Sequence, residues 1–98
     1  TEVEEALTAH PGIREAAVVG VPAGPSGERV RAVVVRTDPA LTPAQVRAWA
    51  AERLAAYKVP REVVFAEDLP KSPIGKVLRK EVRAAQAAAS VLTVQSGG

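Results

Sequence analysis

Residues 16–36 read AAVVGVPAGPSGERVRAVVVR, two valine-rich runs separated by a short stretch rich in glycine and proline. Short apolar runs that are bounded by turn residues are typical of buried β-strands. We therefore expect strands at 16–22 and 29–36, and the six-residue connection between them favours an antiparallel hairpin. This hairpin decides the fold, because flanking helices need its faces to bury their apolar sides.

Helices are expected on both sides of the hairpin. Residues 2–9 place apolar side chains at helical spacing, and the sequence HPG at 10–12 then ends that helix. A second helix has the clearest start in the chain. Thr42 is a candidate N-cap, Pro43 occupies the first helical position, and Gln45 completes a capping box.

The apolar face of this second helix predicts its length. Its members recur at helical spacing and continue for several turns: Val46, Trp49, Ala50, Leu54 and Tyr57. The helix must stop before Pro60, because a residue that precedes proline avoids helical angles, so Val59 is expected to be extended.

A third strand over residues 62–66 and a last helix from about Lys76 to residue 89 complete the pattern. Leu78, Val82 and Ala85 are expected to point inward from that helix. The sum is an α+β fold in which a small three-stranded sheet, including one hairpin, is flanked by three helices.

Length and composition limit the classes of protein. We expect one small domain over residues 1–89 and a flexible tail over residues 90–98, which show no clear period. The chain has no cysteine and a single histidine, His10, which stands in the HPG turn and is expected to be structural. This excludes a disulfide framework and thiolate metal sites, and it leaves no basis for a zinc site or a histidine-based catalytic triad.

The chain also lacks signals for membranes and nucleic acids. No apolar run approaches the roughly eighteen residues of a membrane span, and acidic residues stand where a secretory signal would carry basic ones. A net charge of +2 and only three aromatic residues do not favour nucleic-acid binding. We expect a cytoplasmic protein, and the missing initiator methionine suggests a fragment of a longer chain.

The stretch that most clearly indicates a functional site is LPKSPIGKVLRKEVR, residues 69–83. Gly75 can adopt backbone angles that other residues avoid, while Pro70 and Pro73 stiffen the approach to it. A lysine on such a loop can present its charge to an anion such as a phosphate or carboxylate. The residues themselves leave a second interpretation open, in which Lys76 is a solvated residue at the start of a helix.

A phosphate-binding P-loop does not fit this stretch. That motif needs a glycine where Pro70 stands and a serine or threonine where Val77 stands. Lys76 would therefore act as a single charge, delivered to a site that other residues build. A solvated basic stripe is expected on the same helical face as Lys76, formed by Arg79, Lys80 and Arg83.

Three stretches resemble, in order, the small C-terminal domain of the adenylate-forming enzymes. This family, the ANL superfamily, includes acyl-CoA synthetases, aryl-CoA ligases, adenylation domains of peptide synthetases and luciferases. The stretches are VEEALTAHPGIREAAVVGVPAGPSGERVRAVVV (3–35), LAAYKVPREVVFAEDLP (54–70) and LPKSPIGKVLRKEVR (69–83). The resemblance covers residues 2 to about 85 and implies the C-terminal domain of an AMP-dependent acyl- or aryl-CoA ligase.

Two motifs distinguish the branches of this family. Peptide-synthetase domains usually carry aspartate at the position of Leu78, whereas acyl- and aryl-CoA synthetases usually resemble the GKVLRK of this chain. LAAYKVP also differs from the LPxYMVP form that is common in peptide synthetases. The resemblance therefore implies a CoA ligase, with a peptide-synthetase adenylation domain as the alternative.

The resemblance also implies a two-step reaction. A carboxylic acid attacks the α-phosphate of ATP, with Mg²⁺ present, to give an acyl-adenylate, and the thiolate of CoA then displaces AMP. Lys76 matches the family's catalytic lysine, which stabilises the negative charge that gathers at that phosphorus. The domain is then implied to rotate for thioester formation. ATP and Mg²⁺ would bind mainly to a large N-terminal domain, so this part alone is expected to be inactive.

Other residues receive roles from the same resemblance. Pro70, Ser72 and Gly75 are expected to support the loop. Lys58 and Arg61, in YKVPR, are candidates to contact the phosphates of CoA, and simple solvation is the alternative for both.

A regulatory role is also suggested. PKSPIGK resembles sites that protein lysine acetyltransferases modify in this family, so Lys76 is a candidate acetylation site and an acetyltransferase a candidate partner. A stand-alone module that ends in Gly97 and Gly98, like a ubiquitin-type tag, is less favoured than a frayed end. Glu28 is expected to be structural, near the end of the hairpin.

Overall fold

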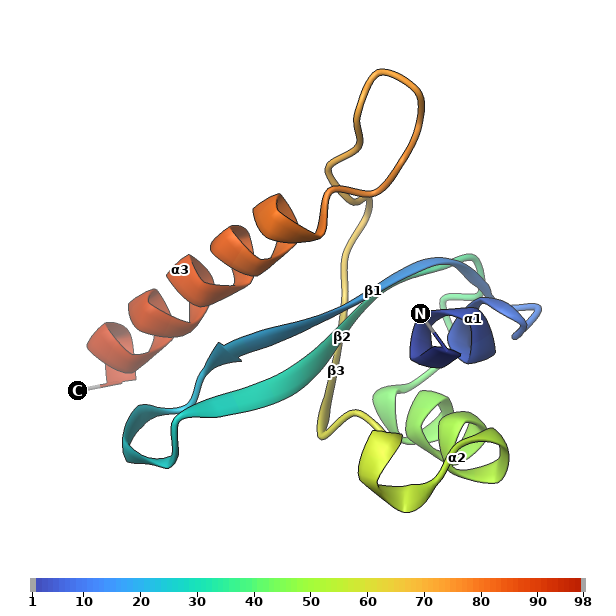
Figure 1. Ribbon diagram of the computed structural model, residues 1–98, viewed down its shortest axis with the longest axis horizontal. Coiled ribbons are helices and arrows are strands. Elements are labelled where there is room, and N and C mark those ends of the chain that lie inside the picture. Colours follow the sequence, from blue (N-terminus) through green and yellow to red (C-terminus); the bar gives the residue numbers. More distant parts are fainter. Residues whose placement is uncertain (1, 98) are drawn as a thin grey trace.

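The computed structural model describes residues 2–97, without the side chains of Ser26 and of residues 89–97. Along the chain the helices and strands are α1 (Glu2–Thr8), β1 (Ile13–Pro22), β2 (Glu28–Arg36), α2 (Pro43–Arg53), β3 (Glu62–Phe65) and α3 (Arg79–Gly97). Two short 3₁₀ turns, η1 (Gly24–Ser26) and η2 (Ala56–Lys58), lie in the connections. The expected α+β fold, with three helices around a three-stranded sheet, is confirmed (Figure 1).

The sheet has the order β1-β2-β3. β1 and β2 form the expected antiparallel hairpin, and β3 pairs with β2 in parallel after the chain has passed through α2. Because β2 is the central strand and is covered on both faces, it reads as a continuous valine-rich run instead of an alternating one.

Two apolar clusters lie on opposite faces of this sheet. On one face, Ala32 and Val34 of β2 pack with residues from α1 and α2, among them Leu7 and Val46. On the other face, Val33 and Val35 pack with Leu69 and with Val82 of α3. Figure 1 shows this arrangement, with α3 on one side of the hairpin and α1 and α2 on the other.

The start of α2 follows the sequence pattern. Thr42 Oγ1 accepts a hydrogen bond from the Gln45 amide at 3.2 Å, and the Gln45 side chain accepts one from the Thr42 amide at 2.9 Å. These two bonds make the capping box that was expected, with Pro43 in the first turn.

The end of α2 differs from the expectation. The helix ends at Arg53, and Leu54 leaves it in an extended conformation with φ −123° and ψ 153°. This turn keeps Leu54 buried but breaks the helical period, so Tyr57 falls in η2 and is 84% exposed. The expectation that Tyr57 belongs to the buried face was therefore wrong. Val59, before Pro60, is extended as expected, with φ −70° and ψ 124°.

The last helix also starts later than expected, at Arg79 instead of Lys76. Val82 is buried and Leu78 half-buried, as expected, but Ala85 is exposed. The helix starts late because Lys76 and Val77 pair with Ser72 and Lys71 on the opposite arm of a loop, so they cannot join the helix. The backbone of α3 continues to Gly97, and the expected flexible tail over residues 90–98 stays a prediction, since their side chains lie outside the described part.

Within the part of the chain that the structure describes, no helix combines the length and apolar character that crossing a bilayer requires.

Candidate functional site

Residues 70–78, called the lysine loop below, project away from the sheet and helices (Figure 1). The loop is a small hairpin in which Lys71 and Val77 form an antiparallel bridge. The amide of Leu78 donates to the carbonyl of Pro70 at 2.9 Å, and the amide of Ser72 donates to the carbonyl of Lys76 at 2.8 Å. These backbone bonds fix the two arms of the loop to each other.

The tip of the loop is a tight turn over residues 72–75. The amide of Gly75 donates to the carbonyl of Ser72 at 2.8 Å, and Pro73 occupies the second position, where its fixed φ suits a β-turn. Gly75 has φ +86°, which residues with a Cβ rarely adopt, although the space around it is open. The positive φ is therefore the reason that glycine is required at this position, and the backbone has the pattern of a β-turn followed by a β-bulge.

Lys76 follows this bulge and is exposed. Its amide donates to the Ser72 hydroxyl at 3.3 Å, so the lysine backbone is held from within the loop. Among the residues that the structure describes, none forms a hydrogen bond or ion pair with the Lys76 ammonium group. Lys76 does not begin a helix, as one interpretation of the sequence had it, but stands on a projecting hairpin.

The base of the lysine loop is tied to β1 by charged side chains. The Lys71 ammonium lies 3.0 Å from the Glu15 carboxylate and also pairs with Asp68. The hydrogen bond from Lys71 lowers the pKa of Asp68, and the bonds to Asp68 and Glu15 raise the pKa of Lys71. Arg14 adds a contact of 3.5 Å to Asp68. The orientation of the loop is thus set by contacts outside it.

The start of α3 is tied to α1 and β1 through Glu4. Its carboxylate pairs with Arg79 and accepts a hydrogen bond from the Val18 amide at 2.8 Å. Burial acts to raise the pKa of the Glu4 carboxyl, but the hydrogen bonds from Arg79 and Val18 outweigh it and lower the pKa to about 2. This pair fixes the helix that follows the lysine loop.

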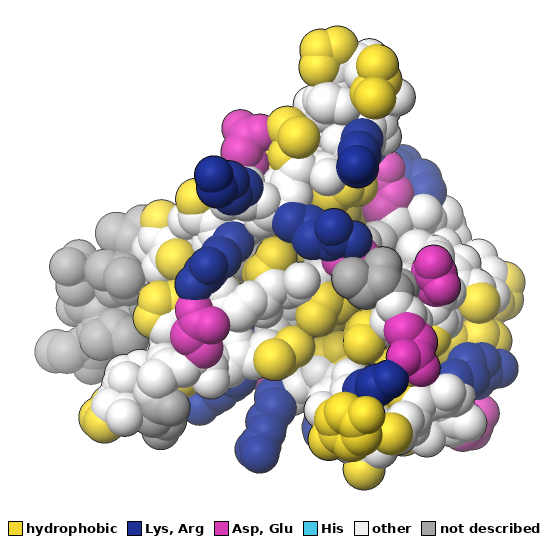
Figure 2. Space-filling model, in the orientation of Figure 1, with side chains coloured by type: hydrophobic (Ala, Val, Ile, Leu, Met, Phe, Trp, Pro, Cys, Tyr) yellow, Lys and Arg dark blue, Asp and Glu magenta, His cyan; other side chains and the backbone are white. Residues whose placement is uncertain are grey.

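The second arginine of α3 makes a similar contact. Arg83 pairs with Glu28 and donates to the carbonyl of Gly20 at 3.1 Å, which joins α3 to the far end of the hairpin. The expected basic stripe is therefore not simply solvated, since Arg79 and Arg83 are paired. Figure 2 shows basic and acidic side chains side by side over this region. The ion pair with Arg83 joins Glu28 to α3, and the structural role expected for Glu28 stays a prediction.

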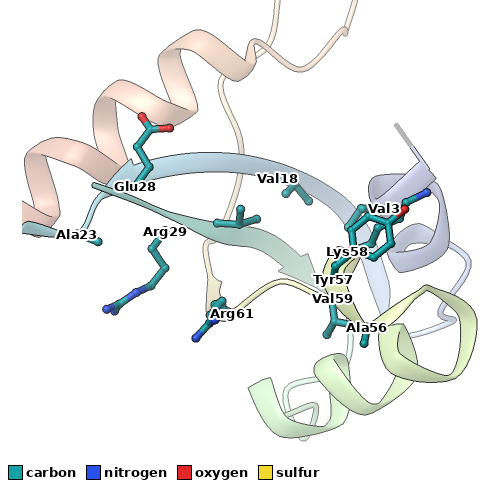
Figure 3. A pocket seen from close by; sticks show the side chains of 11 residues that line it. Val3, Val18, Ala23, Glu28, Arg29, Ala56, Tyr57, Lys58, Val59 and Arg61 are labelled. Carbon is teal, nitrogen blue, oxygen red and sulfur yellow. The ribbon is translucent and has the colours of Figure 1, made fainter. Parts of the chain in front are cut away.

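A second candidate site is a pocket of about 760 Å³ between the hairpin and η2. Figure 3 shows Tyr57 and Lys58 beside Val3 at one end, and Arg29 and Arg61 toward the hairpin.

The cations of this pocket differ in their partners. Lys58 pairs with Glu2, and Arg29 pairs with Glu62 at 3.2 Å. Within the described residues, Arg61 has no acidic partner. Arg61 is therefore the basic side chain of this pocket that is most available to an added anion.

The structure does not bring the two groups of expected site residues together. The lysine loop contains Pro70, Ser72, Gly75 and Lys76, whereas Lys58 belongs to η2 and Arg61 directly precedes β3. The segment that joins α2 to β3 lies at the end of the domain opposite the lysine loop (Figure 1).

Sequence reasoning missed three features that bear on the site. Glu4 and Glu15 anchor the loop and α3, but their partners are 75 and 56 positions away in the chain, so no local pattern could reveal them. Ile74 is 87% exposed at the tip of the lysine loop. An isoleucine placed between Pro73 and Gly75 in a turn was the available signal for it.

Comparisons with known proteins agree with this architecture. The family model described as AMP-binding enzyme C-terminal domain matches residues 2–76. The long-chain-fatty-acid–CoA ligase of Salmonella typhimurium is 49% identical over 82 residues, which are 84% of this chain and 15% of that protein. The chain thus spans about 15% of the length of the curated relatives it matches.

Solved structures of CoA ligases also match this chain. A Mycobacterium tuberculosis fatty acyl CoA synthetase superposes with a TM-score of 0.82 at 36% identity, covering 90% of this chain and 18% of that one. A benzoate CoA ligase from Burkholderia xenovorans superposes with a TM-score of 0.72 at 39% identity, and the match covers 84% of this chain and 17% of the ligase chain.

Proposed function

Because the chain belongs to the AMP-binding enzyme C-terminal domain family, we propose that it supplies the adenylation lysine of an ATP-dependent acyl- or aryl-CoA synthetase. The proposal rests above all on one observation. Lys76 stands on a projecting, internally bonded hairpin, and its ammonium group has no partner among the described residues. A preplaced cation of this kind is suited to an active site that the rest of the enzyme forms.

The chemistry assigned to Lys76 is electrostatic. When the carboxylate of the acid attacks the α-phosphate of ATP, negative charge gathers on the phosphate oxygens and on the departing pyrophosphate. The Lys76 ammonium would stabilise that charge without taking part in proton transfer. Removing one preorganised donor of this kind costs about 10²- to 10³-fold in rate.

The similarities support a CoA ligase over the alternative of a peptide-synthetase domain, because the relatives described above carry CoA ligase or acyl-CoA synthetase names. Their names cover both long-chain fatty acids and benzoate, so we propose a carboxylic acid substrate without choosing its class. ATP and Mg²⁺ would bind mainly to the rest of the enzyme. We place the reaction in the cytoplasm, where ATP and CoA are supplied.

We propose that CoA binds to this domain itself, in the pocket beside η2. The pocket beside η2 combines the exposed ring of Tyr57 with the cations of Lys58 and Arg61, which suits a nucleotide that carries phosphates. Arg61 would give the stronger contact, since Lys58 already pairs with Glu2. CoA supplies the thiol for the second step, and the residues of this pocket would only bind and orient it.

The test uses the complete enzyme that contains this domain. Lys76→Ala should lower acid-dependent ATP–pyrophosphate exchange by about 10²- to 10³-fold, while thioester formation from supplied acyl-adenylate is largely kept. Lys80→Ala is the matched control, because Lys80 is also an exposed lysine close in sequence. Normal exchange in Lys76→Ala would overturn the proposal.

Regulation by acetylation is a second candidate role for Lys76. Its exposure on a projecting loop favours access by a protein lysine acetyltransferase, and acetylation would remove the charge that adenylation needs. Mass spectrometry of the enzyme after treatment with an acetyltransferase and acetyl-CoA would test this. Loss of exchange in proportion to acetylation of Lys76 supports the role, and modification elsewhere without such loss contradicts it.

A further inference from the structure

Ile74 is the most exposed large hydrophobic residue in the described part of the chain, at 87%. It belongs to neither of the two apolar clusters that hold the domain together. Its neighbour Pro73 is exposed as well. Figure 2 shows hydrophobic side chains at the end of the projection that the lysine loop forms.

The position of Ile74 is fixed relative to Lys76. Both residues belong to the hairpin closed by the bridge between Lys71 and Val77, and only Gly75 lies between them. The backbone bonds at 2.8 Å around Ser72 and the left-handed Gly75 hold the turn in one shape. An apolar contact made by Ile74 would therefore also fix the depth and direction at which Lys76 is presented.

We infer that Ile74 is a positioning residue for adenylation, which seats the lysine loop against an apolar surface of the larger part of the enzyme. This inference rests on the proposed function. Its partner is the remainder of the same polypeptide, because the chain spans about 15% of its curated relatives and no described residue of the domain covers the loop tip. Lys76 provides the charge, and Ile74 provides a contact that places it.

The physical basis is the hydrophobic effect combined with preorganisation. Transferring an exposed isoleucine to an apolar surface is favourable in proportion to the apolar area that leaves water. If this contact forms only when the loop is inserted, its free energy favours the adenylation geometry specifically. Truncating the side chain should then slow adenylation without weakening the binding of ATP or acid.

The test is a graded series in the complete enzyme: Ile74→Leu, Ile74→Val, Ile74→Ala and Ile74→Ser. We expect near-normal ATP–pyrophosphate exchange for leucine, a small loss for valine, and a loss of about 10- to 50-fold for serine. The loss should fall on kcat, with the KM values for ATP and acid unchanged. Thioester formation from supplied acyl-adenylate should be normal throughout, and Ala51→Ser, another exposed apolar site, should have no effect.

The outcomes separate this inference from the function on which it rests. Because Ile74 makes no core contact, the series should keep the thermal stability of the enzyme, so a loss of exchange cannot be assigned to unfolding. If Lys76→Ala abolishes exchange while the Ile74 series is flat, this inference is wrong and the proposed function stands. If Lys76→Ala leaves exchange intact, the proposed function itself fails.

Discussion

Replacing Glu4 by glutamine tests how α3 and the lysine loop are held to the domain. The side chain of Glu4 is only 11% exposed, and its carboxylate pairs with Arg79 at the start of α3 while accepting a hydrogen bond from the Val18 amide. Glutamine keeps the size of the side chain and an oxygen that can accept from Val18. The substitution therefore removes mainly the charge that Arg79 faces.

The size of the effect follows from the pKa of Glu4, which is lowered from 4.5 to about 2 in the folded protein. At about 1.4 kcal/mol for each tenfold change in proton affinity, this difference corresponds to roughly 3 kcal/mol. Arg79 is 51% exposed, so solvent screening reduces its share. We expect Glu4→Gln to lower the free energy of unfolding by about 1–2 kcal/mol at pH 7.

The pH dependence has a definite sign. A carboxyl group whose pKa is lower in the folded state stabilises the protein fully above the unfolded value of 4.5, and this stabilisation is lost as the pH falls toward about 2. The difference in stability between the wild type and Glu4→Gln should therefore shrink as the pH is lowered from 5 to 2.5.

Urea denaturation of the 98-residue chain, followed by circular dichroism at several pH values, measures these free energies. Glu5→Gln is the matched control, because Glu5 is an exposed residue of the same helix and undergoes the same change of charge. A difference between the wild type and Glu4→Gln that is absent at pH 7, or that does not vary with pH, would refute the assigned role of Glu4.

Three further substitutions address the sites directly. Gly75→Ala should strain the lysine loop, because a φ of +86° costs a residue with a Cβ about 1–2 kcal/mol. We expect ATP–pyrophosphate exchange to fall about tenfold, while the melting temperature of the domain is nearly unchanged. Normal exchange in this variant would contradict the reasoning. Arg61→Ala should raise the KM for CoA in the thioester step about 5- to 20-fold and leave exchange unaffected. Lys58→Ala should have a smaller effect, and an unchanged KM for CoA in both variants would exclude the pocket beside η2 as the CoA site.

The sequence predicted those parts of the fold that depend on neighbouring residues. The valine runs of the hairpin and the capping box at Thr42 and Gln45 are local patterns, and the structure forms both as expected. The end of α2 was predicted poorly, because the apolar period continues to Tyr57 although the chain leaves the helix at Leu54. Leu54 is buried in the extended conformation that ends the helix, so the apolar spacing beyond it no longer marks a helical face.

The same distinction applies to the candidate site. Gly75 and the two prolines indicated a constrained loop, but the helical spacing after Lys76 suggested that the helix began there. The bridge between Lys71 and Val77 competes with that helix for the same residues, and it is stabilised by contacts to Glu15 that lie far away in sequence. A local pattern cannot weigh such contacts, so the hairpin had to be seen in the structure.

The anchoring of the lysine loop also bears on how Lys76 could move during the reaction. Its arms are bonded to each other, its base is tied to β1 through Lys71 and Glu15, and the helix after it is tied to α1 through Arg79 and Glu4. Bending the loop alone would break several of these contacts at once. If Lys76 leaves the active site after adenylation, the least costly motion is therefore a rotation of the whole domain that carries the loop unchanged. A disulfide or crosslink that fixes this domain to the rest of the enzyme should then block one half-reaction and spare the other, whereas stiffening the loop should harm neither.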